Sequence, residues 1–358
     1  MPLEASTKVR VLIIGFGYVA QHLISAMRDD ERFEVSCGAR SKKSVDVVKS
    51  VPLDVCDAES CAGALWATLP DVVVNTAAMS SPTQCEQDEA LAMRTNCPTA
   101  LLEACFAVVP DALFVQFSTD LVLEDGAGRR HADGGDSMSA IRAVIASSRP
   151  TNAYGRSKLA FEKALLAFPR VVLLRSSNAL GPAAPFTNDG KFVQWLVGEL
   201  ESGNSVELYY DEIRSFVSIA QIVRGVVAAV DRFGLSYLPA DNRADALAAA
   251  TKPSETAFYE QEARRTYPPV WLHLNVGGPE PLSRVHVGRA IAHAAGLDHA
   301  RIAAIPRPDN VVTPLDVALD SSAFASLLGV PLVPVRDALF QDFLRRGEEP
   351  DEPASPSE

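Results

Sequence analysis

The chain has 358 residues, 47% of them hydrophobic, which is enough to bury a large core and to build two lobes. Its formal net charge of −12 argues against a nucleic-acid-binding groove. No segment approaches the about 18 uninterrupted apolar residues of a membrane span, and we predict no membrane association. The six cysteines and six histidines show no metal-ligand spacing, so we predict no metal. The N-terminus lacks a signal-peptide core, and we expect a cytoplasmic protein.

The chain opens with a strand followed by a glycine-rich turn. Residues 9–14 are mostly apolar, as in a strand buried on both faces of a parallel sheet. Residues 15–20 then follow the pattern G-x-G-x-x-A at the start of an apolar-periodic helix. Glycine permits the tight turn and lets backbone N–H groups approach a pyrophosphate at the helix N-terminus. We therefore expect a dinucleotide site at Gly15, Gly17, Tyr18 and Val19.

The second predicted strand, 33–39, ends in a basic, hydroxyl-rich cluster. Arg40, Ser41 and Lys42 stand where a carboxylate would bind the ribose hydroxyls of NAD. Cations at this place pair instead with the 2′-phosphate of NADP. The cluster favours NADP(H) over NAD(H). Asp54 ends the next predicted strand, 51–55, and we expect it to line the cofactor.

Further strands and helices alternate along the chain. Strands are predicted at 71–79, 112–123 and 171–182, and helical stretches at 86–106 and 151–168. This alternation is typical of an α/β Rossmann fold with a doubly wound parallel sheet.

Tyr154 and Lys158 lie four residues apart in the predicted helix 151–168, so both side chains share one helix face. An ammonium beside a phenol favours the phenolate and lowers a pKa that is ordinarily about 10. Reduction of a carbonyl needs a hydride at carbon and a proton at oxygen. The pair therefore suits proton donation in a reductase.

The order of these motifs resembles the extended short-chain dehydrogenase/reductase superfamily. The glycine-rich turn, NTAAM, FSTD, YGRSK and LRSSNALGP carry the resemblance over roughly residues 8–345. Four segments are similar, more narrowly, to the dTDP-4-dehydrorhamnose reductases and to the related regulatory β subunits of methionine adenosyltransferase: 72–105, 117–126, 274–284 and 307–330.

The resemblance implies a role for each matching residue. Thr119 would hydrogen-bond the substrate carbonyl, Tyr154 would donate the proton, and Lys158 would hold the nicotinamide ribose. Ala77 and Ala78 would line the cofactor. Substrate contacts are implied for Ser118, Thr119, Asn178 and Arg214, the last toward the phosphates of a sugar nucleotide.

Two departures from the family pattern bear on the substrate. The turn is one residue shorter than the usual G-x-x-G-x-x-G and ends in alanine. Leu121 and Leu123 replace two aromatic residues, one of which would lie near the sugar. These departures do not affect the expected hydride transfer, but they leave open whether the substrate is a deoxysugar.

We expect an NADP(H)-dependent reductase of a nucleotide-linked keto-sugar. Two alternatives stay open: an NADP-binding regulatory subunit with methionine adenosyltransferase as partner, and a sugar-nucleotide epimerase or dehydratase. A homodimer is also left open.

The expected domains are interleaved. An NADP-binding Rossmann domain spans 8–175, with returns near 217–233 and 271–276, and a smaller α/β substrate lobe spans 176–346. Segment 237–270 is predicted to be a surface insertion. The acidic, Pro/Ser-rich tail 347–358 is predicted to be disordered.

Overall fold

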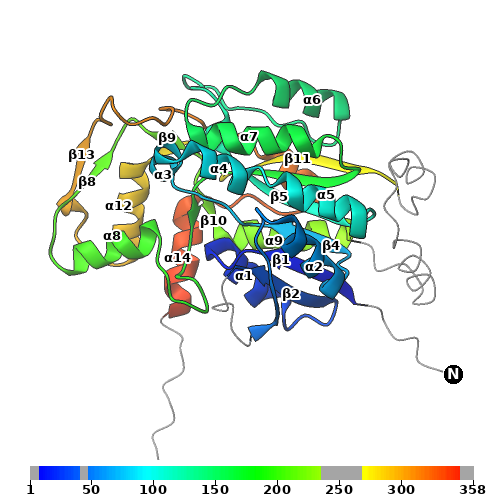
Figure 1. Ribbon diagram of the computed structural model, residues 1–358. Helices are drawn as coiled ribbons and strands as arrows, with labels where there is room; N and C mark the ends of the chain where they lie inside the picture. Colours follow the sequence, from blue (N-terminus) through cyan, green and yellow to red (C-terminus); the bar gives the residue numbers. More distant parts are fainter. Residues whose placement is uncertain (1–7, 41–46, 235–267, 347–358) are drawn as a thin grey trace, which may run out of the picture.

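The computed structural model describes residues 8–40, 47–234 and 268–346, and its centre is a seven-stranded parallel sheet (Figure 1). Across the sheet the strands run in the order β11-β6-β5-β4-β1-β2-β3. Their bounds are β1 Val9–Ile14, β2 Phe33–Ala39, β3 Lys49–Pro52, β4 Val72–Asn75, β5 Leu113–Thr119, β6 Arg170–Ser176 and β11 Val270–Val276. Strand order reverses between β1 and β4, and ligands bind at the carboxyl ends of strands beside such a point. The predicted doubly wound fold is confirmed.

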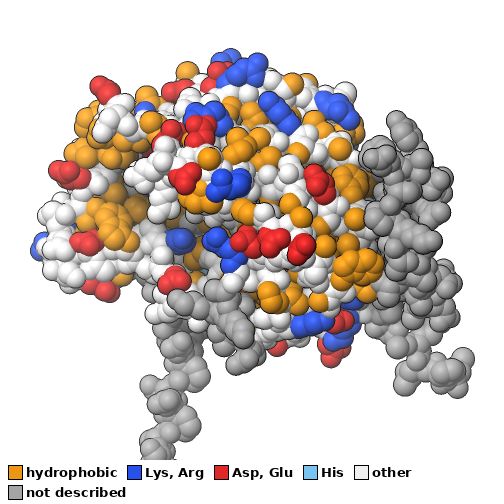
Figure 2. Space-filling model, viewed as in Figure 1, with side chains coloured by type: hydrophobic (Ala, Val, Ile, Leu, Met, Phe, Trp, Pro, Cys, Tyr) orange, Lys and Arg blue, Asp and Glu red, His pale blue; other side chains and the backbone are white. Residues whose placement is uncertain are grey.

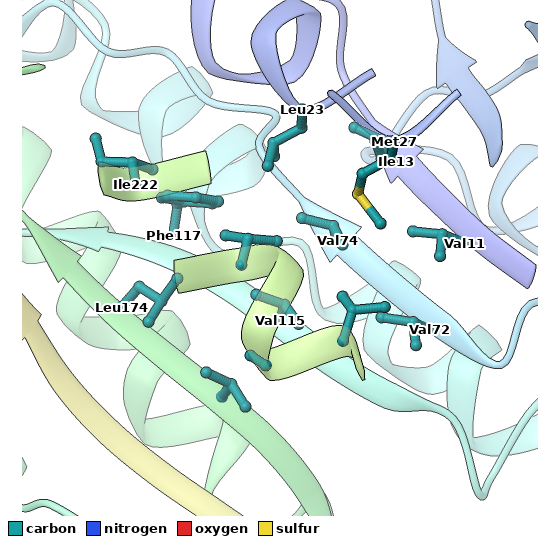
Figure 3. Close-up of a cluster of buried hydrophobic side chains, with 14 of the residues drawn as sticks. Val11, Ile13, Leu23, Met27, Val72, Val74, Val115, Phe117, Leu174 and Ile222 are labelled. Carbon is teal, nitrogen blue, oxygen red and sulfur yellow. The ribbon is translucent and has the colours of Figure 1, made fainter. Parts of the chain in front are cut away.

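Helices cover both faces of the sheet. One face carries α1 (Tyr18–Met27), α9 (Ile219–Phe233) and α13 (Ser322–Leu328). Figure 3 shows the core beneath them, where Leu23 and Met27 of α1 meet Val11 and Ile13 of β1 and Ile222 of α9 lies near Phe117 of β5. The other face carries α2 (Ala58–Thr68), α5 (Thr99–Val108), α6 (Met138–Ser147) and α7 (Ala153–Leu165). Burial on both faces explains the near-continuous apolar strands.

A smaller lobe has its own core and lies beside the carboxyl ends of the strands (Figure 1). Its helices are α8 (Phe192–Glu201), α12 (Arg284–Ala294) and α14 (Val335–Arg346), with the short η3 (His299–Arg301). Its strands pair as β8 (Val206–Tyr209) with β13 (Ile302–Ile305), parallel, and β9 (Ile213–Arg214) with β12 (Leu282–Ser283), antiparallel. The short strands β7 (Ala179–Leu180) and β10 (Val217–Ser218) pair with each other in parallel, and β10 leads directly into α9.

Local boundaries differ from the sequence prediction at several places, and two of these differences have a clear local cause. The predicted helix 86–106 is three helices: α3 (Pro82–Gln87), α4 (Glu89–Asn96) and α5. Asp88 ends α3 and caps α4 by accepting a hydrogen bond from the Leu91 N–H, and Pro98, which lacks an N–H, stands before α5. The predicted strand 112–123 ends at Thr119, because its hydroxyl accepts the Leu121 N–H and starts the 3₁₀ turn η2 (Asp120–Val122).

The interleaving follows from α9 and β11. The helix α9, predicted as a return near 217–233, packs on the sheet, and β11, predicted near 271–276, is its outer strand beside β6. Most of the predicted insertion 237–270 and all of the tail 347–358 lie outside the described residues. Within the described ranges, no helix is both long and apolar enough to cross a membrane.

Candidate active site

The glycine-rich turn between β1 and α1 has the form of a cradle for an anion. Gly15 has φ +100°, and a Cβ there would lie 2.9 Å from the Thr76 side-chain oxygen, so both the conformation and the space require glycine. Gly17 is exposed, is the N-cap of α1, and would meet nothing within 4 Å if it carried a Cβ. The first N–H groups of α1 therefore face open space, as a bound pyrophosphate requires.

The next two predicted cofactor residues lie within the first turn of α1. Tyr18 is buried, and its hydroxyl donates to the Pro182 carbonyl at 2.9 Å. Val19 is partly buried beside it and packs against the core. Tyr18 thus joins the turn to the segment that follows β7.

The remaining predicted cofactor residues follow the strands at the same edge of the sheet. Arg40 is exposed directly after β2, whereas Ser41 and Lys42 lie outside the described residues. Asp54 follows β3, and its carboxylate accepts the Cys56 N–H at 2.9 Å. Ala77 and Ala78 follow β4, partly and fully exposed. The carboxyl ends of β2, β3 and β4 thus carry these residues around the turn.

Thr119, Tyr154 and Lys158 are brought together from two elements. Thr119 ends β5, and α7, which packs on β5, carries Tyr154 in its first turn and Lys158 one turn later (Figure 1). The Thr119 side chain lies close enough to the Tyr154 hydroxyl to lower the pKa of that phenol. Lys158 is buried. The three side chains that the sequence selects as catalytic converge at the carboxyl edge of the sheet.

The register of α7 depends on a close backbone approach. Asn152 caps the helix by accepting the Gly155 N–H at 2.8 Å. A Cβ at Gly155 would lie far inside van der Waals contact with the Leu121 carbonyl oxygen, so only glycine lets α7 pack this near to η2. This approach sets the depth of Tyr154 relative to Thr119.

The pKa of Tyr154 differs from the sequence prediction. Burial raises the pKa of Tyr154 above its usual value, and the nearby Asp120 carboxylate raises it further, while the Thr119 hydrogen bond lowers it. Burial lowers the pKa of Lys158 to about 8, and the Glu162 carboxylate, followed by Cys85, opposes that shift. The expected lowering of the Tyr154 pKa is therefore wrong for this structure, because desolvation outweighs it. The phenol keeps its proton at neutral pH.

Two side chains near this set were missed by the sequence argument. Asp120 is buried, accepts a hydrogen bond from Thr119 at 3.2 Å, and has a pKa raised by burial. Asn96, at the end of α4, donates to the Ser157 hydroxyl at 3.0 Å and the Met79 carbonyl at 3.1 Å. It thereby ties α7 to the segment after β4. Asp120 stands directly after Thr119 in the FSTD motif, whereas Asn96 gave no local signal.

Two predicted substrate residues, Ser118 and Arg214, form hydrogen bonds with other buried groups of the protein. Ser118 donates its hydroxyl to Glu162 at 2.5 Å inside the core. Arg214 is 2% exposed. Its terminal nitrogens donate to Glu212 at 3.0 Å and to the carbonyl oxygens of Ile213, Pro314 and Leu315. These contacts use both terminal nitrogens of Arg214 and favour a structural role for it. The substrate contacts of Ser118 and Arg214 stay predictions.

Asn178 lies between β6 and β7, partly buried, and its carbonyl accepts the Val217 N–H at 3.1 Å.

Glu212 forms ion pairs with both Arg214 and Arg284, so these three charged side chains are linked. Figure 2 shows the surface hollowed between the lobe carrying α8 and α12 and the sheet domain, with Lys and Arg side chains beside the hollow. This local positive charge contrasts with the net charge of the chain.

Comparison with known proteins gives a family and a fold. The model of the NAD dependent epimerase/dehydratase family matches residues 11–236. A probable low-salt glycan biosynthesis reductase, Agl14, of Haloferax volcanii is 29% identical over 164 residues, which are 45% of this chain and 50% of that protein. The chain thus spans about half the length of this curated relative.

Two solved structures superpose over nearly the whole chain. The dTDP-4-dehydrorhamnose reductase of Bacillus anthracis, in complex with NADP, has a TM-score of 0.68 and 16% identity, covering 96% of this chain and 100% of that one. The UDP-glucose 4-epimerase of Thermus thermophilus, in complex with NAD, has a TM-score of 0.69 and 20% identity, covering 95% and 100%. At these identities the likeness shows a shared fold. The family match, which spans more than half of the chain, shows that this protein belongs to the NAD dependent epimerase/dehydratase family.

Proposed function

We propose that this chain is an NADP(H)-dependent reductase that converts a nucleotide-linked keto-sugar to the corresponding alcohol. The observation that carries the proposal is the placement of Thr119 at the end of β5 against α7, which carries Tyr154 and the buried Lys158. The named reductases among the similar proteins support the reaction class.

The turn after β1 would hold the cofactor. Its exposed Gly17 and the first N–H groups of α1 fit a pyrophosphate, and Arg40 stands at the strand end where a 2′-phosphate would lie. Bound NADPH supplies the hydride. The preference for NADP(H) over NAD(H) rests on Arg40 with its neighbours Ser41 and Lys42.

Residues of the protein position the carbonyl and donate the proton. Thr119 fixes the substrate carbonyl oxygen near the phenol, and Tyr154 donates its proton to that oxygen as the carbon accepts hydride. Because the pKa of Tyr154 is raised, the phenol is protonated before the reaction. Lys158, charged below a pKa of about 8, binds the nicotinamide ribose and stabilises the phenolate that forms.

The test is a reaction of the full-length protein with a dTDP-4-keto-6-deoxy sugar and NADPH deuterated at the transferable position. A reductase oxidises one NADPH per product and places the deuterium on the former carbonyl carbon. An epimerase changes the sugar without net oxidation of cofactor. Turnover by neither route, with NADPH still bound, would favour the regulatory alternative, which a pull-down with methionine adenosyltransferase then examines.

A further inference from the structure

Beneath the catalytic helix lies an ion pair that is closed off from solvent. Glu162 of α7 and Arg175 of β6 both have side chains with 0% exposure. Arg175 donates Nη2 to Glu162 Oε2 at 2.6 Å and Nε to Oε1 at 3.0 Å, which is a bidentate arrangement. Arg175 also acts electrostatically on three other titratable groups, His131, Asp133 and His273.

The same carboxylate is bonded to the strand that carries Thr119. Ser118 donates its hydroxyl to Glu162 Oε1 at 2.5 Å, and Ser118 and Arg175 are paired residues of the neighbouring strands β5 and β6. Arg175 also donates to the Ser148 hydroxyl, beyond the end of α6, at 2.8 Å. A single carboxylate thus connects α7, β5 and β6.

Glu162 also stands in register with the catalytic residues of its own helix. Tyr154, Lys158 and Glu162 are successive at intervals of four, so they lie along one face of α7. An anchor at Glu162 therefore fixes both the depth and the rotation of the turn that presents Tyr154 and Lys158.

Stability alone is a poor reason for such a pair. Removing two charges from water is costly, and apolar residues of similar volume often stabilise a core as well or better. The core on this face of the sheet is otherwise built from aliphatic and aromatic side chains. The pair is better explained by what it does for its neighbours.

We propose that Glu162 is a positioning residue: held by Arg175 and Ser118, it sets α7 against β5 and so fixes the turns that present Tyr154 and Lys158. This inference rests on the proposed role of Lys158 in the reductase. The charged and titratable groups that act on Lys158 are Glu162 on its own helix and Cys85 on α3. The pKa of Lys158 is lowered to about 8 mainly by burial, and Glu162 is the largest influence that raises it.

The test follows the titration of Lys158 directly. The chain has eight lysines, so the full-length protein labelled with ¹³Cε-lysine gives few resonances, and Lys158→Met assigns the one of interest. We expect a wild-type midpoint near pH 8. In Glu162→Gln the midpoint should fall by about one pH unit, since a nearby carboxylate has been removed.

Two further variants separate positioning from folding. Glu162→Gln/Arg175→Met removes both charges and leaves no unpaired cation, so it serves if the single variant fails to fold. Its midpoint should also fall, but by less than in Glu162→Gln, because the lost Arg175 cation had opposed the carboxylate. Asp71→Asn breaks the ion pair with Arg10 (2.9 Å), which lies at the amino ends of β1 and β4, away from Lys158. It should lower the melting temperature without changing the Lys158 midpoint.

A wild-type midpoint in either Glu162 variant would overturn the inference and leave the pair a structural feature. Because the titration needs neither cofactor nor sugar, its result is independent of the proposed function. If the Lys158 midpoint falls in the variants but the protein reduces no keto-sugar, the proposed reductase function is refuted, and the effect of Glu162 on Lys158 is still supported.

Discussion

Replacing Arg214 with methionine decides whether this arginine supports the fold or binds a substrate phosphate. Methionine keeps much of the buried volume and removes every donor, so the partners of Arg214 lose their hydrogen bonds. Removing one partner of a buried ion pair costs about 3–5 kcal/mol. Glu212 keeps its contacts with Arg284 and Thr313, so we expect the lower end of that range, about 3 kcal/mol.

This loss converts into a measurable change of melting temperature. An unfolding entropy of about 2.1 cal/mol/K per residue gives about 0.75 kcal/mol/K for 358 residues, so Arg214→Met should melt about 4 °C lower. The matched control is Arg284→Met, whose side chain is 29% exposed and pairs with the same Glu212. It should cost about 1 kcal/mol, or little more than 1 °C. Unchanged melting of Arg214→Met, with only a raised KM for a sugar nucleotide, would refute the structural assignment.

Three further substitutions test the cofactor cradle and the register of α7. Gly17→Glu should leave the melting temperature unchanged, since a side chain there meets nothing within 4 Å, yet abolish NADPH binding in fluorescence titrations by placing a negative charge at the pyrophosphate. Gly155→Ala should destabilise the fold by about 1–3 kcal/mol and lower kcat, because the added methyl collides with the Leu121 carbonyl; wild-type values of both would contradict the packing argument. Arg40→Ala should weaken NADPH binding by at least about tenfold and NADH binding little, as a charge-assisted hydrogen bond contributes about 1.5–3 kcal/mol. Equal affinity of the unaltered protein for both cofactors would refute the NADP(H) preference.

The sheet and the pairing of Tyr154 with Lys158 could be predicted from the sequence because both depend on local pattern. An apolar run followed by G-x-G predicts β1 and its turn, and a spacing of four within a helix places two side chains on one face. The bounds of β2, Phe33–Ala39, match the predicted strand.

The side-chain partners of buried charges were beyond the sequence. Nothing near Arg214 indicates that its donors meet carbonyl oxygens about 100 residues away, at Pro314 and Leu315. Ser118 and Thr119 look equivalent in FSTD, yet Ser118 donates its hydroxyl to Glu162 inside the core. The pKa of Tyr154 likewise depends on enclosure by the fold, which an argument from its spacing to Lys158 omits.

The most direct test of the account is turnover of Tyr154→Phe on the keto-sugar that the unaltered protein reduces. The substitution removes the hydroxyl beside Thr119 and keeps the ring, so NADPH binding and folding should persist. Loss of a general acid typically lowers the rate by about 10²–10⁴, and we predict a fall of kcat in that range. Wild-type kcat in Tyr154→Phe, with the same NADPH affinity, would contradict the mechanism.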